Sequence, residues 1–282
     1  MNDDAERDAV LGAYGLRLRG VDLPELLVPA ADAWPGLSLS VDVLPERKVV
    51  EHVADDRATL RLRTGGHVVV ERAASRATYA VPRPLSADAL VHPFLAPVAA
   101  VMAHWHGRES FHAGGVVAED GVWGVVGDRW AGKSSTLAWL ALGGHEIVAD
   151  DLLVLERAST RVYAGPRSVD LRPESAALLG AGEALGVVGA RERWRLRLEP
   201  VPGDLPLRGW IVLAWGDDVA VRPLGGAERV SILAAQRGLR VPPTDPTVFL
   251  DLAALPCWEL RRPHQWSSLE AAARLLLDTV VR

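Results

Sequence analysis

A phosphate-binding motif is the most chemically specific feature of the sequence. Residues 127–134 read Gly-Asp-Arg-Trp-Ala-Gly-Lys-Ser, which matches the pattern of Gly, any four residues, Gly, Lys and then Ser or Thr. Of the 31 Lys and Arg residues only Lys48 and Lys133 are lysines, and the chain's own composition gives roughly one chance match in a thousand. In such a loop the backbone N–H groups wrap the α- and β-phosphates of a nucleotide, the lysine reaches the β- and γ-phosphates, and the hydroxyl of Ser134 holds Mg²⁺. The expected nucleotide-binding residues are Gly127, Asp128, Arg129, Trp130, Ala131, Gly132, Lys133, Ser134 and Ser135.

The elements that must position this loop are indicated on both sides of it. The apolar, β-branched run 122–126 predicts a buried strand, and the run 134–142 predicts a helix. Gly143 and Gly144 then end the helix, as a left-handed cap does. A loop between a strand and a helix places bound phosphates at the helix N-terminus, where free N–H groups and the helix dipole favour anions.

Two adjacent carboxylates are the second set of residues that could take part in a reaction. The run Glu146-Ile-Val-Ala-Asp150-Asp151 predicts a strand that begins directly after the loop helix and ends in Asp150 and Asp151. In sheets of this type the carboxyl ends of the strands meet at the edge where ligands bind. One carboxylate would share Mg²⁺ with Ser134, and the other would accept a proton from an incoming hydroxyl. In the alternative interpretation the second aspartate is a solvated strand end or caps the next turn.

His112 is placed near the loop by a predicted hairpin. If residues 118–121 form its turn, Val117 faces Val122, and the same register brings position 112 opposite Gly127. His112 would then orient the γ-phosphate or an acidic partner; a structural, hydrogen-bonded histidine at a strand end is an equally weighted alternative.

Several arginines follow the acidic strand. Arg167 and Arg172 lie close enough behind it in sequence to return to the same edge and steady a phosphoryl group. Arg191, Arg193, Arg195 and Arg197 alternate with Trp194, Leu196 and Leu198. That alternation favours a strand whose arginine face is solvated; a row of guanidinium groups meeting an acidic peptide or a phosphate is the alternative.

Composition limits the class of protein. The chain has 282 residues, 49% of them hydrophobic and 24% charged, as in an ordinary globular protein of one large or two medium domains. No run of 18 apolar residues occurs and the first eight residues are acidic, so we expect a cytoplasmic location and no membrane partner. The single cysteine, Cys257, excludes an internal disulfide and is expected to be buried. The net charge of −5 gives no reason to expect nucleic acid as a partner.

The rest of the chain divides into two regions. Up to about residue 84, period-2 runs such as 37–43 and 59–63 predict half-buried antiparallel strands, with a hairpin between 59–63 and 67–72. A helical segment follows at 85–107, with Ser86 as its N-cap and prolines 93 and 97 as breaks. We therefore expect a β-rich N-terminal region at 1–107 and a catalytic domain at 108–282.

Late in the chain, capping signals mark two helices. Asp245-Pro246 predicts an N-cap followed by proline at the first helical position, and residues 267–270 predict a capping box that opens a terminal helix to about residue 279.

The stretch 112–156 resembles the catalytic core of the HPr kinase/phosphorylase superfamily. The matching features are His112 with Gly114 and Gly115, the loop 127–134, Gly144-His145, and Val-Ala-Asp-Asp at 148–151. The resemblance implies an α/β fold with a P-loop kinase core of HPr kinase type, to which the β-rich N-terminal region is added. It also implies ATP and Mg²⁺ as cofactors, Asp150 as general base with His112 assisting, and Ser134 with Asp151 as metal ligands.

The sequence also departs from that family. Arg129 and Trp130 stand where the bacterial regulatory kinases have small residues, and a second family signature is missing after Glu156. HPr is therefore not the expected acceptor, and the chain looks more like divergent HPr-kinase-related proteins, some of which are similar to kinases that phosphorylate a serine of a ribosomal peptide precursor. The family also makes a homo-oligomer an expectation.

The sequence favours one activity and leaves two alternatives open. The favoured activity is transfer of the γ-phosphate of ATP to a hydroxyl, on Ser or Thr of a peptide or protein, with an Asp general base and Mg²⁺. The first alternative is a small-molecule kinase that acts on a metabolite or sugar. The second is a regulatory protein that binds a nucleotide without catalysis.

Overall fold

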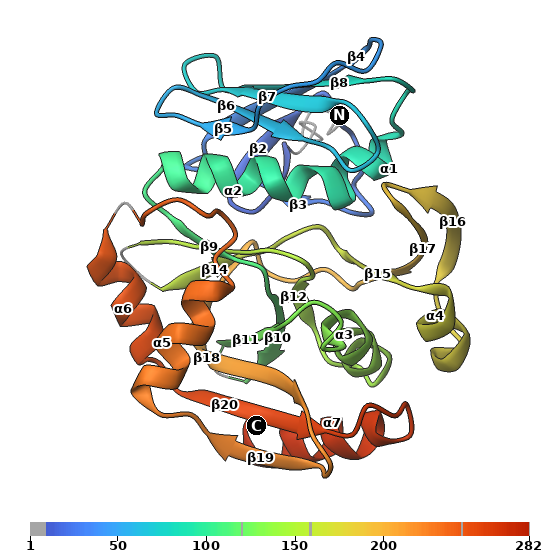
Figure 1. The fold of residues 1–282 in the computed structure, drawn as a ribbon, viewed down its shortest axis with the longest axis vertical. Helices are drawn as coiled ribbons and strands as arrows, with labels where there is room; N and C mark the ends of the chain where they lie inside the picture. The colour runs from blue at the N-terminus through green and yellow to red at the C-terminus, as the bar shows by residue number, and fades with distance from the viewer. Residues whose placement is uncertain (1–9, 120, 158–159, 244, 282) are drawn as a thin grey trace, which may run out of the picture.

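The computed structural model of the chain describes residues 10–119, 121–157, 160–243 and 245–281. The acidic stretch 1–8 and Asp120 of the predicted turn lie outside the described residues. Figure 1 shows an N-terminal sheet at one end of the molecule, helix α2 (Leu95–Trp105) packed beneath it, and on the other side of α2 a second sheet, called the central sheet below. The structure is thus a mixed α/β fold, as predicted.

The N-terminal sheet holds eight strands of the described chain, in the order β3-β1-β2-β4-β8-β7-β6-β5. The strands are β1 (Leu11–Ala13), β2 (Leu16–Arg19), β3 (Val28–Pro29), β4 (Gly36–Val43), β5 (His52–Val53), β6 (Arg57–Arg61), β7 (His67–Glu71) and β8 (Arg76–Val81). The predicted hairpin is confirmed, because β6 and β7 pair antiparallel with Arg61 opposite His67. The expectation of antiparallel pairing throughout is wrong for β4, which runs parallel to both β2 and β8. Alternation shows that a strand has one buried face but carries no information on the direction of its neighbours.

The helical segment follows β8 and is broken in the middle. It consists of α1 (Ala87–Ala89), a wide turn η1 (Leu90–Phe94) and α2 (Leu95–Trp105). Ser86 caps it as predicted, accepting from the Ala89 N–H at 3.2 Å. His92 interrupts the helix with extended backbone angles (φ −148°, ψ 118°), which the residue before a proline favours over helical ones. Residues 87–105 are long and apolar enough to cross a membrane, but 67% of this stretch is buried inside the fold, as in a core helix.

The central sheet carries the predicted motif. Its strands follow the order β12-β10-β11-β18-β14-β13-β9, and β20 and β19 continue it beyond β18. They are β9 (Glu109–Phe111), β10 (Gly114–Ala118), β11 (Gly121–Gly127), β12 (Ile147–Ala149), β13 (Leu153–Leu155), β14 (Arg161–Tyr163), β18 (Asp204–Trp215), β19 (Ala220–Pro223) and β20 (Cys257–Arg262). β11 is parallel to β18, and β18 to β20. β12 and β11 each pair antiparallel with β10, so they also run in one direction and end at one edge.

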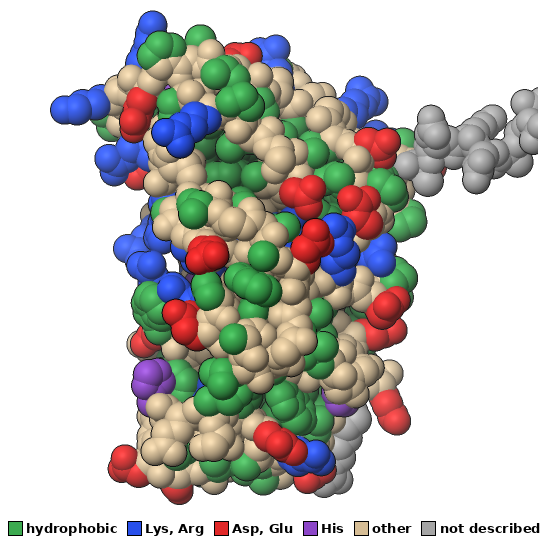
Figure 2. Space-filling view, turned by 90° about the vertical axis from the view of Figure 1, so that its right-hand side faces the viewer, with side chains coloured by type: hydrophobic (Ala, Val, Ile, Leu, Met, Phe, Trp, Pro, Cys, Tyr) green, Lys and Arg blue, Asp and Glu red, His purple; other side chains and the backbone are tan. Residues whose placement is uncertain are grey.

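Helices and a small sheet cover the central sheet. The remaining elements are α3 (Lys133–Leu142), β15 (Ser168–Leu171), α4 (Pro173–Leu179), β16 (Glu183–Val188), β17 (Arg191–Arg197), α5 (Gly226–Ala235), α6 (Pro246–Ala254) and α7 (Ser268–Thr279). β15, β17 and β16 form a three-stranded antiparallel sheet beside α3 (Figure 1). On the side of the molecule that carries this sheet, acidic and basic side chains are scattered among apolar ones (Figure 2).

Two hydrophobic clusters hold these layers together. The larger includes side chains from both predicted regions, among them Tyr79, Val98 and Trp210, and the smaller lies under α3 and α7. The division at residue 107 stays a prediction. Cys257 is 3% exposed, which confirms its predicted burial.

The two late helix starts had different outcomes. Asp245 caps α6 as predicted, because its carboxylate accepts from the Thr247 N–H at 2.9 Å. α7 exists, but the predicted capping box does not form. Ser267 itself has helical backbone angles (φ −56°, ψ −21°), whereas a capping residue is typically extended.

Substitution of Gly124 would test the packing of the central sheet. A Cβ added there would lie 2.6 Å from Cε3 of Trp210, a fully buried side chain on the neighbouring strand β18. We expect Gly124→Ala to lower the free energy of unfolding by about 1–3 kcal/mol or more through overpacking. In the control Gly36→Ala nothing lies within 4 Å of the new Cβ, so its stability should be unchanged or about 0.4–1 kcal/mol higher. Urea unfolding would contradict this packing if both variants had the same midpoint.

Candidate active site

The motif loop joins β11 to α3 as the sequence predicted. Strand β11 is buried along its whole length and delivers the chain to residues 128–132, after which α3 begins at Lys133. The turn depends on unusual backbone angles at Gly132 (φ 90°) and Trp130 (φ 76°), the second of which is rare for a bulky residue. The ammonium group of Lys133 lies inside the arch of the loop and donates to the carbonyl of Gly127 at 2.7 Å and of Asp128 at 3.4 Å.

The acidic pair lies at the edge of the sheet where the loop is. Because β12 and β11 run in the same direction, Asp150 and Asp151 follow β12 at the edge where β11 delivers the loop. The hydroxyl of Ser134 donates to Oδ1 of Asp150 at 3.3 Å. Asp151 adopts a left-handed backbone conformation (φ 71°) that a residue of its type tolerates better than most. The structure therefore brings the motif serine and the two predicted carboxylates together.

Asp150 is the more buried carboxylate of the two. It is 2% exposed, whereas the side chain of Asp151 is 33% exposed. Burial and the adjacent charge of Asp151 raise the pKa of Asp150 to about 7. A carboxylate in this position titrates near neutral pH or requires a neighbouring cation to stay ionised.

His112 reaches the site by a different route from the one predicted. The hairpin register is confirmed, with Val117 opposite Val122, but the ladder ends at Gly114 and does not include His112. The pairing of His112 with Gly127 is therefore wrong. Phe111 belongs to β9, which pairs with β13, and the chain turns before β10 begins.

The actual partner of the His112 ring is the backbone of the acidic pair. Nδ1 donates to the carbonyl of Asp151 at 2.9 Å, which fixes the proton on Nδ1 and leaves Nε2 as an acceptor in the neutral ring. Desolvation and the charge of Lys133 lower the pKa of His112. His112 thus lies in the site as a neutral group that orients the backbone of Asp151.

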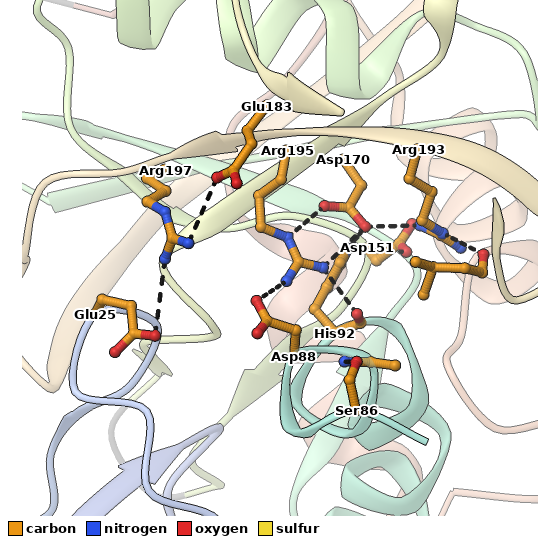
Figure 3. Close-up of polar contacts among 12 residues, drawn as sticks. Glu25, Ser86, Asp88, His92, Asp151, Asp170, Glu183, Arg193, Arg195 and Arg197 are labelled. Atoms are coloured by element: carbon orange, nitrogen blue, oxygen red, sulfur yellow. Dashed lines mark hydrogen bonds and ion pairs between the residues drawn. The ribbon is translucent and has the colours of Figure 1, made fainter. Parts of the chain in front are cut away.

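The prediction of a solvated arginine face on β17 is wrong for Arg193 and Arg195, whereas Arg197 at the end of the strand is exposed. Arg193 is 8% exposed and Arg195 is 1% exposed. Arg195 makes two hydrogen bonds to Asp170, through Nε to Oδ1 at 2.8 Å and through Nη2 to Oδ2 at 3.2 Å, and donates to Asp88 at 3.0 Å (Figure 3). Arg193 donates through Nη1 to the same Oδ2 of Asp170 at 3.1 Å. The inward face of β17 is charged because a buried carboxylate on β15 meets it.

The buried cluster of Asp170, Arg193 and Arg195 is connected to the acidic pair through His92. Nε2 of His92 lies 3.5 Å from Oδ2 of Asp170 and 3.9 Å from Oδ2 of Asp151 (Figure 3). Burial lowers the pKa of His92, although the two carboxylates act in the opposite direction. The carbonyl of His92, outside the helical pattern, accepts from Nη2 of Arg195 at 2.9 Å. The broken helix is thereby fixed to β17 beside the site.

Arg172 and Arg167 lie in different environments. The guanidinium of Arg172 lies over the ring of Trp130, with Cζ 3.5 Å from the ring centroid, so this arginine is at the motif loop. Arg167 donates to the backbone carbonyls of Leu198 and Pro24. A role of Arg167 at a phosphate stays a prediction.

Sequence reasoning missed Gln236, which joins two parts of the site. Its side-chain amide donates to Oδ1 of Asp128 in the loop at 3.3 Å. Its backbone carbonyl accepts from the backbone N–H of His112 at 2.7 Å. Gln236 follows α5, more than 100 residues after the motif, and no pattern in the sequence relates the two. His92 was missed as well, although an isolated histidine before a proline in an apolar helix was a visible signal.

The residues present fit a phosphate group with Mg²⁺. A serine hydroxyl and a carboxylate oxygen 3.3 Å apart are both oxygen ligands, the kind that Mg²⁺ takes together with waters and substrate phosphates. Within the described residues no group of three or more His, Cys, Asp or Glu side chains forms a metal site by itself.

Comparisons with known proteins add little to this site. No family model matches the chain, and no curated protein sequence matches it. Among solved structures, the chain is similar to the Hpr(Ser) kinase/phosphatase from Coxiella burnetii, with 11% identity over 60% of this chain and 94% of that one and a TM-score of 0.32. Such a distant likeness carries no functional argument.

Arg195 and Arg197 provide a matched test of the buried cluster, because both lie on β17. Arg195→Met would leave Asp170 with one arginine fewer in a fully buried site, and we expect a loss of about 3 kcal/mol or more of unfolding free energy. Arg197 is 44% exposed and pairs loosely with Glu25 and Glu183, so Arg197→Met should cost about 1 kcal/mol or less. Equal losses in chemical denaturation would contradict the inward orientation of Arg195.

Asp150 provides a test of the electrostatics by pH. Its folded pKa of about 7 lies above its unfolded value, so the contribution of Asp150 to wild-type stability should fall as pH rises from about 4 to about 7 and then stay level. Asp150→Asn removes this dependence. Its stability relative to wild type should therefore rise over the same interval, by roughly 1–4 kcal/mol in total. Thermal unfolding at several pH values, with chelator and without nucleotide, measures the difference; a difference that is independent of pH would contradict the raised pKa.

Proposed function

We propose that this protein is an ATP-dependent phosphotransferase that moves the γ-phosphate to a hydroxyl, with Ser or Thr of a peptide or protein as the acceptor. The observation that carries the proposal is the convergence of Lys133, Ser134 and the Asp150–Asp151 pair at one edge of the central sheet. A phosphate loop alone is compatible with nucleotide binding of any kind. A loop with two carboxylates next to its serine has, in addition, a proton acceptor for a hydroxyl nucleophile. We expect the protein to act in the cytoplasm.

The residues divide the work of the reaction among them. The loop amides and Lys133 hold the phosphates, and Mg²⁺ when bound neutralises charge on the transferred group. One carboxylate of the pair takes the proton of the acceptor hydroxyl as its oxygen bonds to the γ-phosphorus and the bond to the β-phosphate oxygen breaks. The other carboxylate would hold the metal together with Ser134. His112 keeps the backbone of Asp151 in place, and Arg172 on Trp130 adds positive charge at the mouth of the loop.

Two features bear on which aspartate is the base. The resemblance assigns that role to Asp150, and a pKa near neutrality suits a proton acceptor. The contact between Ser134 and Asp150 suits a metal ligand instead. Substitution separates the roles, because loss of the base slows transfer at every Mg²⁺ concentration, whereas loss of a metal ligand raises the Mg²⁺ concentration that is needed.

The two lysines allow a matched test of the site. Lys133→Ala should abolish ATP binding and turnover, since it removes the charge that reaches the β- and γ-phosphates. Lys48→Ala, on an exposed segment of the N-terminal region, should leave both unchanged. Calorimetric titration with Mg-ATP measures binding, and labelled ATP with a serine and threonine peptide library measures transfer. Undiminished ATP turnover by Lys133→Ala would refute the site.

The acidic pair distinguishes a kinase from a nucleotide-binding regulator. We expect Asp150→Asn and Asp151→Asn to retain ATP binding, and the variant that lacks the base to lose transfer by about 10²- to 10⁴-fold at saturating Mg²⁺. Wild-type transfer is the positive control. ATP binding without transfer to any peptide or small-molecule hydroxyl, even by the wild type, would contradict the proposal and favour the regulator.

A further inference from the structure

A second group of side chains lies at the same sheet edge, on the opposite side of the loop from the acidic pair. β18 and β20 run parallel to β11, so their carboxyl ends reach this edge as well. β18 ends at Trp215 and β20 at Arg262, and these two residues are paired in the sheet. Ligands of open parallel sheets bind beyond the carboxyl ends of the strands. The acidic pair and this second group therefore flank the phosphate loop.

A groove opens between the segments that follow these two strands. It has a volume of about 490 Å³ and is lined by Trp215, Gly216, Asp217, Pro263, His264 and Gln265. The rings of Trp215 and His264 have centroids 4.4 Å apart and planes at 75° to each other. They form an aromatic corner, in which a flat group that stacks on one ring meets the edge of the other.

The phosphate loop approaches the groove at Gly132. A Cβ placed on Gly132 would lie 2.8 Å from Nη2 of Arg262 and 3.6 Å from Cη2 of Trp215. Glycine at this position therefore does more than permit the turn, because it also lets the loop approach the groove. The aromatic rings of the groove therefore lie next to the backbone N–H groups of the loop. A nucleotide needs both, because its base stacks on rings and its phosphates accept from N–H groups.

Arg262 is a buried positive charge at this junction. It is 6% exposed, lies with Cζ 4.4 Å from the ring centroid of Trp215, and donates through Nη1 to Gln265 and Ser268 at 3.2 Å. Within the described part of the chain it has no carboxylate partner, and burial lowers its pKa. Buried charges are normally paired. An unpaired guanidinium beside a phosphate loop is suited to an anionic ligand.

We propose that the base of the donor nucleotide binds in the corner between Trp215 and His264, with Arg262 facing the phosphate nearest the ribose. The inference rests on the proposed function and adds where the nucleoside is held. Recognition through ring faces tolerates any base, so purine nucleotides should bind more tightly than pyrimidine nucleotides through their larger stacking area.

A second groove on the molecule does not fit this role. It is lined by Trp139, Leu142, Gly143, Leu178, Leu179, Trp266, Ser267, Leu269 and Glu270. Leu142 is at the opposite end of α3 from Lys133, about 15 Å from the loop by helix geometry. Its tryptophans instead provide a control.

The test compares ATP with inorganic tripolyphosphate, which has the phosphates but no base. Trp215→Ala and His264→Ala should weaken Mg-ATP binding by about 5- to 100-fold and leave tripolyphosphate binding unchanged. Trp215→Phe keeps a ring and should restore most of the ATP affinity. Trp266→Ala, a substitution of the same type in the other groove, should bind both ligands like the wild type. The measurement is calorimetric titration of the full chain, with circular dichroism to show that each variant is folded.

The outcomes separate this inference from the proposed function. Unchanged ATP affinity in both Trp215→Ala and His264→Ala, with the wild type binding both ligands, would overturn the base site and leave the phosphate site intact. An equal loss of ATP and tripolyphosphate binding in folded Trp215→Ala would also overturn it, because the effect would then lie in the loop. A wild type that binds neither ligand, or a Lys133→Ala variant that binds both, would instead refute the proposed function.

Discussion

The candidate site depends on one buried negative charge, the carboxylate of Asp170. It is 1% exposed and meets Arg193, Arg195 and His92. An ionised carboxylate without partners at that depth is strongly unfavourable, so its position requires the two guanidinium groups of β17. Burial acts to raise the pKa of Asp170, and the positive charges around it turn the shift downward. The charge thereby joins β15, β17 and the interrupted helix around His92 into one unit.

That unit contacts the candidate active site at two points, Asp151 and Arg172. His92 lies between Asp170 and Asp151, so the more exposed of the two site carboxylates rests against the cluster. β15 ends one residue before Arg172, and the same strand that carries Asp170 therefore also places Arg172 on the ring of Trp130. The acidic pair and the basic mouth of the loop are held by a common framework. A disturbance of the cluster is expected to alter both.

Local patterns in the sequence predicted the parts of the site that are local in the chain. The strand, loop and helix around Lys133 and the hairpin register between 114 and 125 depend on neighbouring residues, and both are found. β17 shows what local sequence patterns cannot predict. Its alternation correctly indicates two faces, but the choice of the inner face depends on Asp170, more than 20 residues earlier in the chain. His112 shows a second limit, because extrapolating a correct register fails where the strand itself ends.

Trp130 shows how an unfavourable backbone angle can have a physical basis. Its left-handed backbone angle is costly for a large residue, and strain of this kind persists only where the surroundings hold it. Here the exposed ring supports the guanidinium of Arg172 at 3.5 Å, a distance at which a cation and an aromatic face attract each other. A small residue at this position would leave Arg172 without that platform. Arg172 would then be free to turn into solvent, and the mouth of the loop would lose a fixed positive charge. Trp130 and Arg172 are therefore best understood as one unit, which holds a positive charge at the loop where a phosphate group would bind.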